Sequence, residues 1–191
     1  MTTAAAMPRW VGEVLGFWFD ELGRAAWFAR DEAIDATCRE RFSHLIDEIN
    51  ATPFDETVAS PERALASVIV LDQFARNIFR GTARAFAYEL ARAIARLAIA
   101  LHIDKRIIFP DRRIFLYLPF EHSEAYADQL RAVELIEELG DDEFTRYAKA
   151  HCDVVARFGR FPHRNAMLGA PVHAGRDGVS GRVRQLVLIF I

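Results

Sequence analysis

Apolar residues recur at steps of three and four along most of this chain, which is the spacing of one face of an α-helix. Between positions 31 and 50, for example, this spacing is kept by Ile34, Cys38, Phe42, Leu45 and Ile49. Pro and Gly residues mark the breaks between the periodic segments. The pattern predicts helices throughout, with no series of strands before the C-terminal tail.

Turn and capping residues indicate where these helices end. Ser60 followed by Pro61 is typical of a helix start, because Ser caps the first N–H groups and Pro fits the first turn. Gly81, Gly140 and Gly159 supply C-terminal stops. We therefore expect helices over residues 11–19, 31–50, 61–80, 83–103, 111–118, 121–139 and 142–158.

Two pairs of these helices have very short connections and are expected to form antiparallel hairpins. They are residues 61–80 with 83–103, and residues 121–139 with 142–158. Successive helix hairpins are typical of α-solenoids, although no residue pattern recurs here at a fixed period. The sequence predicts an all-α fold in which antiparallel helix hairpins stack in a tetratricopeptide-like or α-solenoid-like single domain.

Three predicted helices carry an ionisable residue on an otherwise apolar face. Asp72 and His151 lie within two of these faces, and His122 with Gln129 interrupts the face of the helix expected over 121–139. Burying such groups costs several kcal/mol unless they are paired or hydrogen-bonded. We therefore expect them to meet partners or to line a cavity. A satisfied packing network and a ligand pocket both explain the pattern.

Further polar residues lie near these positions in the sequence. Arg76 follows Asp72 by four residues, which allows an ion pair along the helix, and Asn77 continues the polar side. Glu124 follows His122 by two residues. Ion pairs four residues apart, such as Asp72 with Arg76, often lie on the solvated surface of a helix. The spacing therefore indicates a site only if Asp72 is buried.

A second polar segment follows the last predicted helix. Arg160, His163 and Arg164 surround a turn that Gly159 and Pro162 impose on the chain. A helix N-terminus with nearby guanidinium groups binds carboxylate or phosphate well. Arginines in such a turn also cap helix carbonyls and hold the turn together. Both roles remain open at this point.

The composition is that of a packed globule, with 52% hydrophobic and 12% aromatic residues among 191. This length fits one domain. A formal net charge of −3 gives no general attraction to nucleic acid or to an anionic membrane. No segment approaches the roughly 18 apolar residues of a membrane-spanning helix. We expect a cytoplasmic protein with no nucleic-acid partner and no membrane partner.

The motifs of common metal and cofactor sites are missing. Cys38 and Cys152 lie far apart and cannot form a disulfide framework or a cysteine zinc site by themselves. The histidines and glutamates between positions 121 and 163 show neither zinc-protease nor di-iron spacing. There is no Walker loop, nucleophile elbow or dinucleotide fingerprint. We expect no metal and no cofactor.

Long motifs carry a resemblance to one bacterial family. They are Phe17-Trp18-Phe19, Trp27-Phe28, and the stretches 71–81, 115–124 and 157–165. From about position 14 to position 169, the chain resembles the domain of unknown function 924, a family described as having a tetratricopeptide-like helical fold. The resemblance implies a helical architecture. It supplies no activity, substrate or catalytic residue.

The sequence departs from this family's pattern after Gly169. Members usually continue with a segment such as Arg-Pro-Ser-Thr-Pro and a last helix, whereas Ala170 begins a Gly-rich stretch that ends in six apolar residues. With suitable codons, a shift of one base from Ala170 onward restores the expected ending. We interpret residues 1–169 as the helical domain and residues 170–191 as an atypical tail, and we hypothesise that a frameshift produced it.

Together these features favour a helical protein with an internal polar pocket for a small anionic ligand. The alternative is a tetratricopeptide-like scaffold that binds a protein or peptide. Whether the protein is an enzyme stays open. The expected ligand-binding residues are Asp72, Arg76, Asn77, His122, Glu124, His151, Arg160, His163 and Arg164.

The tail gives a first prediction. Its last six residues are apolar, uncharged and β-prone, which makes them an aggregation hazard when exposed. Truncation after Gly169 should leave the melting temperature unchanged and reduce aggregation, as measured by thermal unfolding and light scattering. A truncated protein that fails to fold would mean that the tail belongs to the core. Sequencing the gene across the codons for Gly169 and Ala170 tests the frameshift itself.

Overall fold

The computed structural model describes residues 7–86 and 89–165. Within these ranges the chain is helical and contains no strand, so the all-α prediction is confirmed. The first helix, α1 (Arg9–Leu15), continues directly into a π-helical stretch, η1 (Gly16–Leu22). Helix α2 (Glu32–Ala51) follows, and the Asp31 side chain caps its start by accepting from the Ala33 and Ile34 N–H groups.

The next helix is continuous in path but changes its winding. After a 3₁₀ turn, η2 (Phe54–Val58), the chain forms α3 (Pro61–Val68), the π-helical η3 (Ile69–Phe74) and α4 (Ala75–Ile78). The Ser60 hydroxyl accepts from the Arg63 N–H at 3.1 Å, which confirms the predicted start. The π-helical stretch, in which Asp72 lies, was not predicted. Such stretches are rare and often occur at functional sites.

The middle of the chain is more broken than the sequence indicates. A 3₁₀ turn, η4 (Ala83–Phe86), precedes α5 (Glu89–Ala100), and η5 (Asp104–Arg106) follows it. The helix expected over 111–118 is instead α6 (Pro110–Arg113) and η6 (Ile114–Leu116). Pro119 then lies in the first turn of α7 (Leu118–Glu121), where its missing N–H costs no helical hydrogen bond.

The last helices form a hairpin. Helix α8 (Tyr126–Glu137) packs against α9 (Asp142–Phe158), and Gly140 between them has a φ of 73°. The bounds predicted for α9 are confirmed, and the short η7 (Pro162–Arg164) follows it. The helix expected over 121–139 was wrong at its start, because α7 ends at Glu121 and α8 begins only at Tyr126. His122 therefore lies in the connection and Gln129 on α8.

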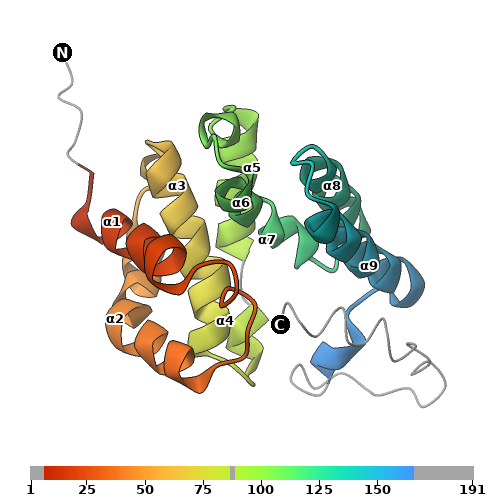
Figure 1. The fold of residues 1–191 in the computed structure, drawn as a ribbon, viewed down its shortest axis with the longest axis horizontal. Coiled ribbons are helices and arrows are strands. Elements are labelled where there is room, and N and C mark those ends of the chain that lie inside the picture. Colours follow the sequence, from red (N-terminus) through yellow and green to blue (C-terminus); the bar gives the residue numbers. More distant parts are fainter. Residues whose placement is uncertain (1–6, 87–88, 166–191) are drawn as a thin grey trace.

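Figure 1 shows how these helices are arranged. Helices α1 to α4 lie on one side, the α8–α9 hairpin lies on the other, and α5 to α7 lie between them. No helix of the described residues is long and apolar enough to cross a membrane. The tail beginning at Ala170, to which the frameshift hypothesis refers, lies outside the described residues.

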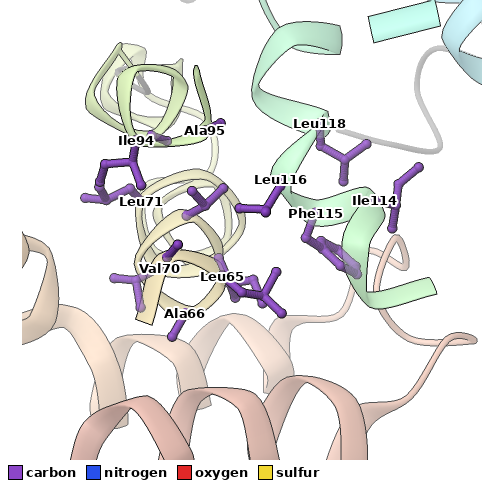
Figure 2. Packing of buried hydrophobic residues seen from close by; sticks show 14 of the residues in the cluster. Leu65, Ala66, Val70, Leu71, Ile94, Ala95, Ile114, Phe115, Leu116 and Leu118 are labelled. Atoms are coloured by element: carbon purple, nitrogen blue, oxygen red, sulfur yellow. The ribbon is translucent and has the colours of Figure 1, made fainter. Parts of the chain in front are cut away.

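The core joins elements that are distant in the sequence. Figure 2 shows Leu65 and Val70 of the helix formed by α3, η3 and α4, with Ile94 of α5 and Leu116 of η6, among the buried side chains that pack between these elements. Phe115 is fully buried and connects this centre to an aromatic group near the N-terminus. Its ring centroid lies 5.0 to 6.2 Å from the rings of Trp18, Phe19, Trp27 and Phe28.

Phe115 should therefore be one of the most costly core positions to truncate. Replacing it with Ala leaves a cavity and removes four aromatic contacts, so the free energy of unfolding should fall by roughly 3–5 kcal/mol. Urea unfolding measures this loss. The control is Phe109→Ala, since Phe109 is 55% exposed and its removal should change stability little. Equal losses in the two variants would contradict the packing described here.

Candidate functional site

A buried contact between a carboxylate and an imidazole lies at the centre of the polar residues that the sequence singles out. Asp72 of η3 and His122, which follows α7, are 1% and 2% exposed. His122 Nδ1 lies 2.8 Å from Oδ1 and 2.9 Å from Oδ2 of the Asp72 carboxylate. The predicted burial of both residues is confirmed. The pair joins the long helix of the N-terminal half to the segment that leads into α8.

Two further groups hold the Asp72 carboxylate in its charged form. The neighbouring Gln73 amide donates to Oδ2 at 2.6 Å, and the buried Arg76 guanidinium places its Nε 3.7 Å from Oδ1. Burial acts to raise the pKa of Asp72, but His122 and Arg76 together hold it below its usual range. A carboxylate that is buried and hydrogen-bonded in this way stays ionised.

Next to this pair lies a second buried acid, Glu121, which contacts His151. Glu121 Oε1 is 3.1 Å from Nδ1 of His151, and both residues are almost completely buried. The same Nδ1 also lies 2.9 Å from the Tyr147 carbonyl oxygen, one turn earlier in α9. Burial raises the pKa of Glu121 to about 8, and the negative charge of Asp72 adds to this effect. The two acids therefore differ in charge at neutral pH.

The histidines of this region are neutral in the folded protein. Burial lowers the pKa of His122 to about 4 and that of His151 to about 3. The positive charges of Arg76 and Arg164 lower both values further. His163 of η7 also has its pKa lowered to about 3 by burial and by the same two guanidinium groups. Both arginines are thus close enough to all three histidines to act on them.

Arg164 approaches the Asp72–His122 pair from the C-terminal side. It donates to the His122 carbonyl oxygen at 3.0 Å and is only 3% exposed. Its guanidinium lies over the Phe161 and Phe86 rings, with 4.3 and 4.8 Å to their centroids. Glu124 Oε1 lies 3.8 Å from Arg164 and accepts from the Phe161 N–H at 2.9 Å. These contacts attach the turn after α9 to the segment after α7.

The structure separates two expected site residues from this group. Asn77 faces α2, where its amide lies 3.7 Å from the Cys38 sulfur and its oxygen lies 3.5 Å from Arg80. Arg160 is half-buried and makes no hydrogen bond or ion pair with any described residue. The polar cluster therefore consists of Asp72, Arg76, Glu121, His122, Glu124, His151, His163 and Arg164.

The connection between α7 and α8 is fixed by a separate set of buried bonds. The Gln129 amide donates to the carbonyl oxygens of Glu121 and Ser123, at 2.6 and 2.5 Å. Ser123 donates to Asp128 at 2.7 Å and accepts from Arg92 of α5 at 2.8 Å. Gln129 was predicted to face the core, and it is fully buried. These bonds position the backbone on either side of His122.

The residues that the structure describes include no group of three His, Cys, Asp or Glu side chains placed to hold a metal ion. Cys38 and Cys152 are buried free thiols, and burial raises the pKa of both. The polar cluster offers guanidinium donors, neutral imidazoles and three carboxyl groups, of which the buried Asp72 and Glu121 differ in charge state. Such a set can bind an anion and exchange protons with it.

The family model for bacterial proteins of unknown function, DUF924, matches residues 14–173. The chain belongs to this family. It is also similar to a solved protein of unknown function from Agrobacterium tumefaciens, with 37% identity and a TM-score of 0.80. That likeness covers 92% of this chain and 95% of the other. No curated protein matches the chain.

Sequence reasoning left one member of the cluster out of the expected site in this DUF924 chain. Glu121 was considered only among the histidines and glutamates between positions 121 and 163 that were compared with metal-site spacings. The available signal was its place directly after the apolar run from Ile114 to Phe120, which indicates burial. An acid that ends such a run needs a partner, and here it is His151.

The opposite pKa shifts predict a stability maximum. In the folded protein the pKa is lowered from 6.5 to about 4 for His122 and to about 3 for His151 and His163. As the pH falls below 6.5, the unfolded chain therefore protonates its histidines while the folded protein keeps these three neutral. Stability is therefore lost toward acid pH. Glu121 keeps its proton up to about pH 8 when folded but only to 4.5 when unfolded, so it lowers stability as the pH rises between these values. With three histidines opposing one acid below pH 6.5, stability should be greatest near that pH.

Urea unfolding from about pH 4 to about pH 9 measures this profile. Glu121→Gln should abolish the loss of stability between pH 6.5 and 8 and retain the loss on the acid side. Glu134→Gln is the control, because Glu134 lies on the surface of α8 with 63% of its side chain exposed. An unchanged alkaline loss in Glu121→Gln would show that Glu121 does not titrate as described.

Proposed function

We propose that the polar cluster binds a small organic anion. The observation that carries this proposal is the burial of two guanidinium groups, Arg76 and Arg164, which are 5% and 3% exposed and act electrostatically on the same three histidines. The histidines are neutral and add no negative charge. A buried electropositive region of this kind favours an anion, since charge-assisted hydrogen bonds gain strength away from water.

The charge states of the buried acids are compatible with a negatively charged ligand. Asp72 is ionised, but the raised pKa of Glu121 keeps most of this carboxyl neutral at pH 7. Among the described side chains of the cluster that are almost completely buried, two positive charges thus accompany one negative charge. The Glu124 carboxyl, whose side chain is 33% exposed, lies 3.8 Å from Arg164, so a ligand carboxylate or phosphate would take the place of Glu124 beside this guanidinium.

A ligand could reach the cluster near η7, where some of the polar side chains are partly exposed to solvent. The Glu124 side chain is 33% exposed, and His163 and Arg160 are half-buried. The other members of the cluster are almost completely buried. A ligand that entered between Glu124 and His163 would meet Arg164 first. Arg160 lies on the same turn and would add positive charge at the entrance.

The competing function is a tetratricopeptide-like scaffold that binds a protein or peptide. The α8–α9 hairpin favours it, as does a surface groove of about 440 Å³ between α2 and α4. The groove has mixed walls, with Ile46, Ile78 and Phe79 beside Arg39, Asp47 and Arg84. In this case the polar cluster only fixes how the helices pack. The two functions differ in whether small anions stabilise the protein.

Calorimetry with phosphate and citrate distinguishes these functions. The parent protein should bind at least one of them, with an affinity that falls as salt increases. Arg164→Met keeps most of the apolar stem but removes the charge. It should weaken binding by at least about tenfold, since a hydrogen bond to a charged group contributes roughly 1.5–3 kcal/mol.

The matched control is Arg131→Met on α8, outside the polar cluster. Arg131 lines a second groove of about 330 Å³ with Arg96 and Phe120, so a loss of binding in this variant would place the anion there. Melting temperatures of all three proteins separate binding from packing. Absence of binding by the parent, together with a large loss of stability in Arg164→Met, would show that the arginine is purely structural.

A further inference from the structure

We infer that Glu124 acts as an internal ligand, whose carboxylate fills the anion site when no ligand is bound and is displaced by a ligand carboxylate. This inference rests on the proposed function and adds two things to it. They are the chemical class of the ligand group and the way in which the chain itself competes with the ligand. Glu124 lies between α7 and α8, whereas the groups that it contacts belong to the turn after α9.

The contacts of Glu124 are those that a bound carboxylate would make. Its Oε1 accepts from the Phe161 N–H at 2.9 Å and lies 3.8 Å from Nη1 of Arg164. Backbone N–H groups and guanidinium groups are the usual donors to a carboxylate in a protein. Arg164 is also held by the His122 carbonyl oxygen and by the Phe161 ring, and Phe161 is fully buried. Both donors therefore stay in position when the Glu124 carboxylate leaves.

The Glu124 side chain can leave without moving a helix. It is 33% exposed, whereas the two groups that it contacts belong to buried residues. The backbone on either side of it is fixed, because the Ser123 hydroxyl donates to Asp128 at 2.7 Å and accepts from the Ala125 N–H at 3.2 Å. Rotation about the side-chain bonds of Glu124 is then enough to take its carboxylate into water, where a charged group is well solvated.

The charges of the cluster favour a carboxylate over a phosphate. While Glu124 is in place, the guanidinium groups of Arg76 and Arg164 are balanced by the carboxylates of Asp72 and Glu124. A ligand carboxylate carries one negative charge and replaces Glu124 one for one. A phosphate monoester carries nearly two charges at neutral pH, so it would leave an excess negative charge beside the buried Asp72. An uncompensated charge in a buried site is costly.

Removing the charge of Glu124 should strengthen ligand binding. Glu124→Gln keeps an oxygen that can accept from the Phe161 N–H, but it no longer competes for the guanidinium of Arg164. By calorimetry it should bind citrate roughly three- to fivefold more tightly than the parent protein, which is the contribution of a partly exposed ion pair. Glu134→Gln is the matched control, since it also removes an acid paired with an arginine, Arg131, but on the surface of α8. It should bind citrate as the parent does.

A second variant tests the class of the ligand group. Glu124→Ala removes the internal carboxylate and leaves its place to a free one, so acetate should raise the melting temperature of this variant. The parent protein and Glu134→Ala should show a smaller rise at the same acetate concentration. Inorganic phosphate should stabilise Glu124→Ala less than acetate does. In ¹⁵N NMR of Glu124→Ala, the Phe161 amide resonance should shift as acetate is added.

The outcomes separate this inference from the proposed function. Citrate binding by the parent that Glu124→Gln does not strengthen would leave the anion site intact and overturn the competing role of Glu124. An equal acetate effect in Glu124→Ala and the parent would do the same, and stronger stabilisation of Glu124→Ala by phosphate would overturn the preference for a carboxylate. If citrate binds neither the parent nor Glu124→Gln, and acetate does not stabilise Glu124→Ala, both the anion site and this inference are overturned.

Discussion

The burial of one negative charge organises this protein. Asp72 lies inside the molecule at a cost that only hydrogen bonds and positive charge can offset, and it obtains them from Gln73, Arg76 and His122. His122 belongs to another part of the chain, so the charge cannot be stabilised until the two halves meet. The need to stabilise the buried Asp72 carboxylate thus fixes where the segment that contains His122 must lie.

Other buried hydrogen bonds hold the backbone on either side of the Asp72–His122 contact. Because His122 must face Asp72, the backbone around it is held by Gln129 and by Arg164, which bond to neighbouring carbonyl oxygens. Arg164 in turn fixes the turn after α9 against Phe161. Hydrophobic contacts such as those around Phe115 supply most of the stabilisation, but the hydrophobic effect does not depend on the direction of a contact. The polar bonds give the helices one relative position.

Much of this arrangement could be read from the sequence, and the exceptions have physical causes. The ends of α9 were predictable because Asp141 and Gly159 act locally, as a cap and as a left-handed residue with a φ of 70°. The burial of Asp72 and His151 followed from helical spacing. The break after Glu121 did not, because the buried bonds that hold it come from Gln129 and from distant Arg92 and Arg164. Asn77 was assigned to the site by adjacency, yet adjacent helical residues point about 100° apart, and it faces α2.

The π-helical stretch from Ile69 to Phe74 has a consequence for how this chain can vary. A π-helical turn contains more residues than an α-helical turn, so it changes the angular register of everything that follows. Without it, Arg76 would be rotated relative to Asp72, and Arg80 would leave the Asp35 carboxylate that it contacts at 2.6 and 2.8 Å. Adding or removing one residue in this stretch would therefore break both contacts. An insertion here would move Arg76 away from Asp72 and Arg80 away from Asp35 at the same time.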